Sequence, residues 1–177
     1  MNEQEQPIIE ALILIDEGDY KSCHWYWMRK EKPWLLWVNA LLWIAFLLIC
    51  IYFFVSTYYL YGAVLLALAL VLNVQRITAP GRYYKKNRAA FDAQRVYAFY
   101  EDCLFTKISD RGSDSEITSQ YSRYLRAEET KTAFYLKTPD KNYVNLPKKC
   151  FSEEQIDVLR ELFGRKFGEK FKECLPK

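Results

Sequence analysis

Charge is missing from one long part of this 177-residue sequence. The stretch from Pro33 to Gln75 contains no Asp, Glu, Lys, Arg or His, and all 25 basic and 22 acidic residues lie outside it. Glycine and proline are also scarce, at six residues each, which excludes a collagen-like or low-complexity chain. An uncharged stretch between highly charged flanks implies two different environments, hydrocarbon for the stretch and water for the flanks. We therefore do not expect a purely aqueous protein.

The residues that usually carry catalysis or hold metals are few and scattered. The five cysteines show no C-x-x-C spacing, so we expect free thiols and no zinc site. The only histidine, His24, stands in the aromatic run CHWYWM, where a packed ring is expected rather than a general base. The sequence has no G-x-S-x-G, no H-E-x-x-H and no Gly-Lys-Ser/Thr phosphate loop. We therefore expect neither an enzyme nor a bound cofactor.

Three pairs of neighbouring carboxylates do not change that expectation. They are Glu101-Asp102, Glu128-Glu129 and Glu153-Glu154. Side chains of adjacent residues on a strand point to opposite faces, so such a pair cannot share one proton in a common site. The last pair is explained by the favourable interaction of acidic side chains with a helix N-terminus.

The uncharged stretch is long enough to cross a membrane twice. Pro33 to Val55 offers 23 residues, which form about 34 Å of helix, and the hydrocarbon core of a bilayer is ~30 Å thick. Tyr58 to Val74 offers 17 residues, the lower limit for a second crossing. Only Ser56 and Thr57 interrupt the apolar run. The sequence therefore predicts a transmembrane helical hairpin over residues 33–75.

Polar and aromatic residues inside the two spans suggest packing rather than transport. For Asn39 and Asn73 we expect interhelical or interfacial hydrogen bonds, because no ionisable residue lies in the spans to form an ion pathway. Trp43 lies in the middle of the first span, away from the interface where tryptophan is enriched. We expect it to pack against the second helix or against lipid.

Basic residues predict the orientation of the hairpin. They flank the two spans and are absent from the Ser56-Thr57 turn: Lys21, Arg29, Lys30 and Lys32 come before, and Arg76, Arg82, Lys85, Lys86 and Arg88 come after. By the positive-inside rule, both termini should lie in the cytoplasm and the protein should be a two-pass protein of the inner cell membrane. Seven acidic residues precede the first span, which argues against a cleavable signal peptide.

Residues 1–32 predict a strand followed by a helix. The run IIEALILI at residues 8–15 is compatible with a buried strand. A less polar face at helical spacing follows, with Asp16 or Asp19 available as the N-cap: Tyr20, Cys23, His24, Trp27 and Met28. An isolated strand cannot satisfy its edges, so we expect it to pair with strands beyond the hairpin. The hairpin would then be inserted into one cytoplasmic domain.

Residues 76–177 predict a basic helix, an antiparallel sheet and a terminal helix. The basic helix is expected over Arg82–Phe91, just past Pro80-Gly81. A loop is expected over residues 110–115, and strands over residues 95–100, 103–108, part of 116–128, 132–138 and 143–146. The expected fold class is α+β, with a small, strongly bent antiparallel sheet closed at one end by the terminal helix.

The terminal helix has the clearest start signal. Ser152 and Gln155 form a capping box, and Phe151 is placed for a hydrophobic staple with Ile156. An apolar stripe follows along Ile156, Leu159, Leu162, Phe163 and Phe167. Lys148 and Lys149, just before the helix, are expected to face solvent at this corner. Binding of a phosphate or another ligand by these two lysines is the alternative.

Short motifs between Gln94 and Phe163 combine into a pattern. They are Glu129-Thr130, Phe134-Tyr135-Leu136 and the Leu-Pro-Lys-x-x-Phe sequence of residues 146–151. With the order of the elements, this pattern resembles the YcxB-like family of small bacterial membrane proteins. The resemblance implies a C-terminal domain over residues 76–177 that is similar to the pleckstrin-homology fold. It implies an architecture rather than an activity.

The expected partners follow from where the basic residues cluster. Arg82, Lys85, Lys86 and Arg88 come just after a membrane span, where anionic lipid attracts each basic residue by ~1 kcal/mol. We therefore expect a contact with membrane lipid and no nucleic-acid binding. The predicted function is a membrane-anchored, non-catalytic binding or regulatory module with an unidentified protein partner. The alternative is a structural subunit of a larger membrane complex that contacts its partners through the hairpin.

Overall fold

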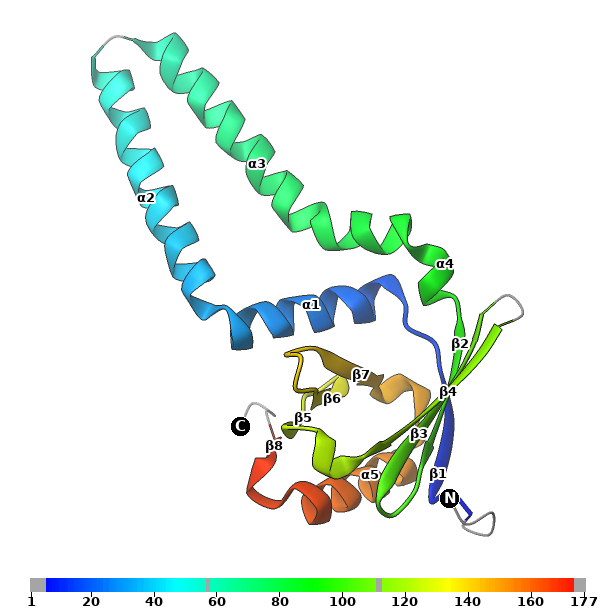
Figure 1. The fold of residues 1–177 in the computed structure, drawn as a ribbon. Coiled ribbons are helices and arrows are strands. Elements are labelled where there is room, and N and C mark those ends of the chain that lie inside the picture. Colours follow the sequence, from blue (N-terminus) through cyan, green and yellow to red (C-terminus); the bar gives the residue numbers. More distant parts are fainter. Residues whose placement is uncertain (1–5, 57, 111–112, 174–177) are drawn as a thin grey trace. The chain divides into compact units, whose positions relative to one another are not determined.

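The chain forms two compact units. The computed structural model describes residues 6–56, 58–110 and 113–173. One unit, here the helical unit, comprises Tyr20–Lys86, and the other, here the sheet unit, joins Met1–Asp19 to Asn87–Lys177. Helices occupy the N-terminal half and two sheets follow, so the fold is of the mixed α+β class (Figure 1).

Two long apolar helices dominate the helical unit. Helix α1 (Glu17–Glu31) leads through Lys32 into α2 (Pro33–Val55), and α3 (Tyr59–Lys86) returns beside α2 (Figure 1). Proline in the first turn suits α2, because its missing N–H would have no intrahelical acceptor there. The most apolar windows of α2 and α3 have mean hydropathies of 2.5 and 1.8, and both helices are long and apolar enough to cross a membrane.

Helix α3 continues through the position where the sequence predicted a break. Residues 82–86 and 88–91 of the helix predicted over Arg82–Phe91 are helical, but no helix begins at Arg82. Helix α3 extends past the buried Pro80 and Gly81 to Lys86, and a short α4 (Arg88–Phe91) follows. Proline at position 80 has no N–H to donate to the Arg76 carbonyl, so α3 lacks one hydrogen bond there. Nearby side chains bond to other carbonyls of the same helix. Arg82 Nη2 donates to the Gln75 carbonyl at 2.7 Å, and Thr78 Oγ1 donates to the Val74 carbonyl at 2.7 Å.

Close packing near the turn favours a glycine in α3. A Cβ atom on Gly62 would lie 3.3 Å from the Phe54 ring and 3.4 Å from Cβ of Phe53. Cys50 Sγ lies 3.9 Å from the Gly62 carbonyl oxygen, and Cys50 is the buried residue of α2. Gly62 therefore lies in close contact with α2 near the turn.

The first sheet joins segments from before and after the helical unit. Its order is β1 (Ile9–Ile13), β2 (Gln94–Phe99), β3 (Cys103–Asp110) and β4 (Ser113–Gln120), and all neighbours are antiparallel. Strand β1 pairs with β2, with Ile9 opposite Phe99. Alternate residues of β1 are buried, so this strand has one buried face and one exposed face.

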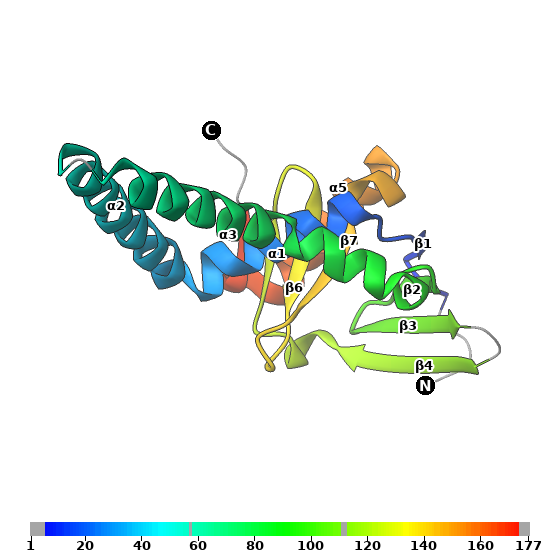
Figure 2. The same cartoon turned by 90° about the horizontal axis from the view of Figure 1, so that it is seen from above.

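Strands β3 and β4 extend further than the sequence predicted. The loop expected over residues 110–115 is wrong at both ends, because the ladder continues until Asp110 lies opposite Ser113. Figure 2 shows strands β3 and β4 side by side. Residues 111 and 112 of that prediction lie outside the described residues. Lys107 Nζ lies 3.4 Å from carboxylate oxygens of both Asp114 and Glu116, so cross-strand ion pairs support the extension.

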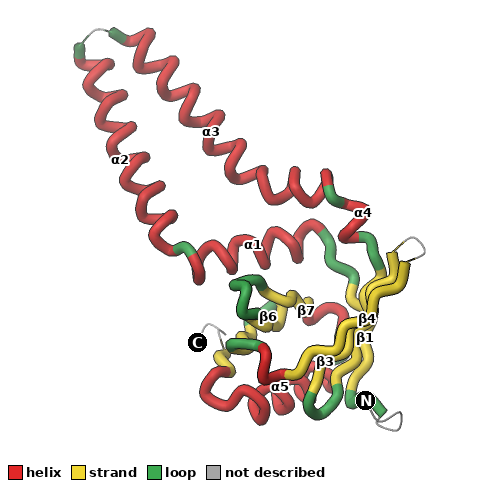
Figure 3. Tube along the Cα trace, in the orientation of Figure 1, coloured by secondary structure: helices red, strands yellow, loops and turns green. Residues whose placement is uncertain are grey.

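The second sheet has the order β7 (Tyr143–Pro147), β6 (Ala133–Lys137), β5 (Arg126–Glu129) and β8 (Phe171–Glu173). Figure 3 labels β6 and β7 among the yellow strands. The prediction of a single strand within residues 116–128 is wrong, because both β4 and β5 reach into that segment, with the short helix η1 (Tyr121–Arg123) between them. The prediction of a wholly antiparallel sheet is also wrong, since β8 pairs parallel to β5.

Helix α5 (Glu153–Phe167) contributes its apolar stripe to the core of the sheet unit. The predicted capping box is present, with the Ser152 side chain accepting from the Gln155 backbone and the Gln155 side chain accepting from the Ser152 backbone. The ring of Phe163 lies 6.2 Å from Phe99 of the first sheet and 5.6 Å from Phe134 of the second. One buried aromatic residue therefore connects α5 with both sheets.

Candidate functional site

The four basic residues predicted to contact lipid are divided between the two units. Arg82, Lys85 and Lys86 are exposed on α3, and their i, i+3, i+4 spacing places them on one side of that helix. Arg88 belongs to α4 in the sheet unit, where its Nε lies 3.2 Å from an Asp92 carboxylate oxygen. The structure thus groups three of the four and gives Arg88 a local ion-pair partner.

Aromatic residues accompany this basic group. The Tyr20 ring of α1 stacks on Tyr83 of α3 with 5.8 Å between centroids, and it lies 6.1 Å from Tyr84. At the other end of α1, the Lys32 ammonium lies 4.8 Å from the centre of a Trp27 ring. Within the helical unit, α1 therefore crosses the open end of the hairpin, from the start of α2 to the end of α3 (Figure 1).

The sequence predicted that Lys148 faces solvent, and the structure shows that it does not. Its side chain is only 14% exposed, because it turns inward from the short helix η2 (Lys148–Cys150) toward the wholly buried Glu129. Lys148 Nζ donates to Glu129 Oε1 at 2.6 Å and lies 5.0 Å from the centre of the Phe134 ring. Lys149 is 50% exposed and forms ion pairs with Asp16 and Asp19.

Glu129 is the centre of a buried ionic network. Arg160 of α5 binds both of its carboxylate oxygens, with Nη2 at 2.7 Å from Oε1 and Nε at 3.0 Å from Oε2. Burial alone would raise the pKa of Glu129, but the hydrogen bonds from Arg160 and Lys148 outweigh it and hold this pKa below its usual value. The network joins β5, η2 and α5, and its role is to fix these elements.

The sequence reasoning missed this network, although signals were present. Arg160 directly follows Leu159 of the apolar stripe, and Glu129 lies in a motif beside a buried strand. Glu128 is also buried, and its Oε1 lies 3.3 Å from Nε of Arg126. The two neighbouring glutamates therefore have separate partners, so they do not form a shared acid–base site.

Lys149 connects the start of α1 to the end of the second sheet. The backbone N–H of Asp19 donates to Asp16 Oδ1 at 2.8 Å, and the N–H of Asp16 donates to Asp19 Oδ2 at 3.1 Å. The Lys149 ammonium joins both carboxylates. Its hydrogen bond to Asp16 lowers the pKa of that carboxyl. The sequence predicted either aspartate as the N-cap. The structure places Asp16 directly before α1 as the cap, and Asp19 inside the first turn accepts the reciprocal bond.

The groups most suited to catalysis are not activated. Burial raises the pKa of the Cys23 thiol to about 11, so this cysteine is protonated at neutral pH. Burial also lowers the pKa of His24, whose ring stacks near Tyr20. No group of three or more metal-ligating side chains occurs within the described residues. Among the described residues, the cysteines at positions 23, 50, 103 and 150 form no disulfide, and Cys174 lies outside the described residues.

Residues 105–163 of the sheet unit run from β3 into α5 and include strands β4 to β7, the Glu129 network and the two motif lysines. This segment matches the YcxB-like protein family. The match confirms the resemblance inferred from the motifs, over one third of the chain. Comparisons with curated proteins and with solved structures find no match. In this YcxB-like segment, Leu-Pro-Lys-x-x-Phe supplies Lys148 to Glu129 and Phe151 to the core.

Proposed function

We propose that this chain is a membrane-anchored, non-catalytic binding or regulatory module at the cytoplasmic face of the inner membrane. Helices α2 and α3 cross the bilayer, and the sheet unit and both termini lie in the cytoplasm. The observation that carries the proposal is the contrast between the units. Only 6% of the most apolar window of each long helix is buried, whereas the sheet unit has its own closely packed core.

The distribution of charge supports the proposed orientation. Residues 20–86 carry eight basic residues and one acidic residue, a net charge of +7. The other residues carry seventeen basic and twenty-one acidic residues, a net charge of −4. All eight basic residues of the helical unit lie in α1, in Lys32 or in the last turns of α3. An excess of basic residues at one end of a hairpin marks the cytoplasmic end.

The basic group on α3 is proposed to contact anionic lipid. Arg82, Lys85 and Lys86 are exposed beside Tyr83 and Tyr84, a combination that suits the interface between headgroups and water. Replacing all three basic residues by Gln should reduce the share of anionic lipid extracted with the full chain in polymer-bounded membrane discs. An unchanged lipid composition around the variant would contradict this contact.

The sheet unit is proposed as the binding part, with a fold similar to the pleckstrin-homology fold. Two four-stranded sheets and a core helix that touches both support this resemblance. Strand β4 forms an edge of the first sheet, and residues 114–118 along it are exposed. An exposed strand edge can accept an extended protein segment by backbone pairing. Attachment to the membrane raises the local concentration, so weak binding would suffice.

A hairpin exchange tests the proposed function against the structural-subunit alternative. Residues 33–74 are replaced by an unrelated transmembrane hairpin, and proteins crosslinked to the chain in native membranes are compared with those of the wild type. A binding module keeps its partners after the exchange, because they contact the sheet unit. Loss of every partner, with the sheet unit still folded by circular dichroism, would favour the alternative.

A further inference from the structure

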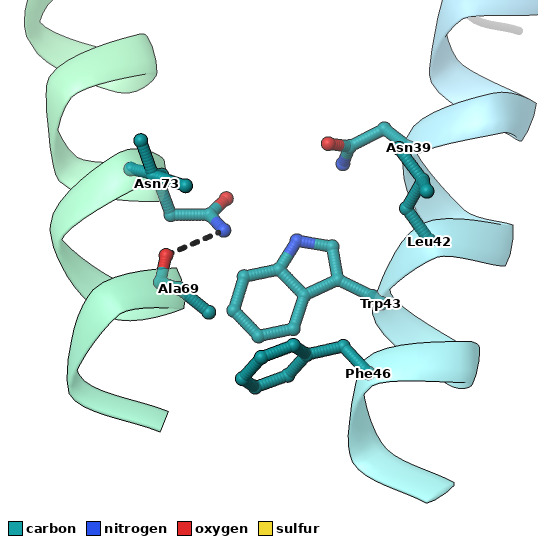
Figure 4. A pocket seen from close by; sticks show the side chains of 7 residues that line it. Asn39, Leu42, Trp43, Phe46, Ala69 and Asn73 are labelled. Carbon is teal, nitrogen blue, oxygen red and sulfur yellow. Dashed lines mark hydrogen bonds between the residues drawn. The ribbon is translucent and has the colours of Figure 1, made fainter. Parts of the chain in front are cut away.

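A groove of about 250 Å³ lies between the two long helices of the helical unit. Seven residues of α2 and α3 line it: Asn39, Leu42, Trp43, Phe46, Ala69, Leu72 and Asn73. Figure 4 shows the two asparagine side chains and the indole nitrogen of Trp43 directed into the same space between the helices. The groove therefore combines polar groups at one end with an apolar floor.

An arginine lies at the polar end of this groove. Arg76 Nη1 donates to Oδ1 of Asn39, and Arg76 is one helical turn beyond Asn73. Asn73 Nδ2 donates to the Ala69 carbonyl at 3.3 Å. Among the described residues, the remaining guanidinium N–H groups, the Asn39 amide N–H groups and the Trp43 indole N–H have no protein acceptor. The site thus presents several donors, a positive charge and no carboxylate.

The order of these residues along the hairpin matches the order of groups in a phospholipid. Asn39 lies six residues into α2, about 9 Å from its start at ~1.5 Å per residue. Asn73 and Arg76 lie toward the end of α3, on the side of the basic residues. Phe46 and Ala69 lie further into the spans. Polar donors therefore lie at the depth of a headgroup and apolar side chains at the depth of an acyl chain.

We propose that this groove binds one anionic phospholipid, a proposal that rests on the membrane crossing of α2 and α3. The lipid phosphate accepts hydrogen bonds from Arg76 and Asn39, and an acyl chain packs over Trp43, Phe46 and Leu72. Guanidinium groups favour phosphate because the interaction is a charge-assisted hydrogen bond with matching geometry. The apolar floor selects a lipid over free phosphate, and the uncompensated positive charge selects an anionic headgroup over a zwitterionic one.

Lipid retention by the purified full chain tests this proposal. The protein is delipidated in mild detergent and titrated with phosphatidylglycerol or phosphatidylcholine, and bound lipid is counted by native mass spectrometry. One phosphatidylglycerol should bind with an affinity that Arg76→Gln lowers about tenfold, the effect of losing one charge-assisted hydrogen bond. Arg123→Gln removes the same charge at an exposed position of the sheet unit, outside the groove and outside the basic group of α3, and should change the affinity less than twofold. Equal effects of the two variants would overturn the proposal.

A second variant tests the groove without touching the arginine. Ala69→Phe should fill the space between the helices and abolish retention of phosphatidylglycerol, with helix content unchanged by circular dichroism. Full retention by this variant would show that the lipid binds elsewhere. Displacement of the lipid by millimolar inorganic phosphate would reduce the site to an anion site and overturn the lipid assignment. Because retention is measured in detergent, its failure leaves the topology of the hairpin to be decided separately.

Discussion

Lys148 and Lys149 are neighbours in the chain, yet their environments differ. Lys148 holds a wholly buried carboxylate, whereas Lys149 bridges two aspartates at the surface. Breaking a buried ion pair leaves a charge without its solvent or its partner, while exposed pairs contribute little because water screens them. The sequence shows two adjacent lysines after a proline. It does not reveal which of them contributes more to stability, because that depends on a carboxylate nineteen residues away.

The contrast predicts different losses of stability. Lys148→Gln should lower the free energy of opening of the second sheet by about 2 kcal/mol, since Glu129 would keep only Arg160 as a charged partner. Lys149→Gln should cost about 1 kcal/mol or less. Hydrogen exchange of β5 and β6 amides in the full chain measures both. Equal losses for the two variants would show that burial of the Glu129 network does not control stability here.

At the level of elements, the sequence predicts a helix end correctly where the groups that stabilise it lie within a few residues along the chain. The start of α2 at Pro33 and the capping box of α5 agree with the sequence because both depend on residues within a few positions. The sequence predicts an element's bounds poorly where its structure depends on residues far away in the chain. Helix α3 continues past Pro80 despite the missing N–H, and β8 is a three-residue strand that pairs with the edge of β5. Three residues alone carry too little pattern to predict a strand.

Two glycines at the end of α5 should respond in opposite directions to the same substitution. Gly164 lies inside the helix and Gly168 caps it at φ +50°, and a Cβ atom on either would meet no atom within 4 Å. Gly164→Ala should stabilise the sheet unit by about 0.5–1 kcal/mol, because alanine favours the helix. Gly168→Ala should destabilise it by about 1 kcal/mol, because alanine disfavours positive φ. Thermal unfolding followed by circular dichroism compares them, and a shift of the same sign in both would refute this explanation.

At the level of the whole molecule, the net charge differs between the helical unit and the sheet unit. The helical unit is strongly basic and the rest of the chain is acidic. This difference is not apparent from the domain boundaries predicted from the sequence, because those boundaries assign the basic residues of 76–86 to the C-terminal domain. The sequence does predict the two apolar spans, because a run without charge needs no partner to be recognised. It could not predict the groove at Asn39 and Arg76, because that site depends on the register between α2 and α3.

The central claim is that α2 and α3 cross the inner membrane and leave the sheet unit in the cytoplasm. Single cysteines at Tyr58→Cys, next to the turn, and at Ser122→Cys, exposed in the sheet unit, report the two sides in a background without the native cysteines. Intact cells are treated with a membrane-impermeant maleimide before and after permeabilisation. The account predicts labelling at position 58 in intact cells and at position 122 only after permeabilisation. Labelling at position 122 in intact cells, or at neither position until permeabilisation, would contradict it.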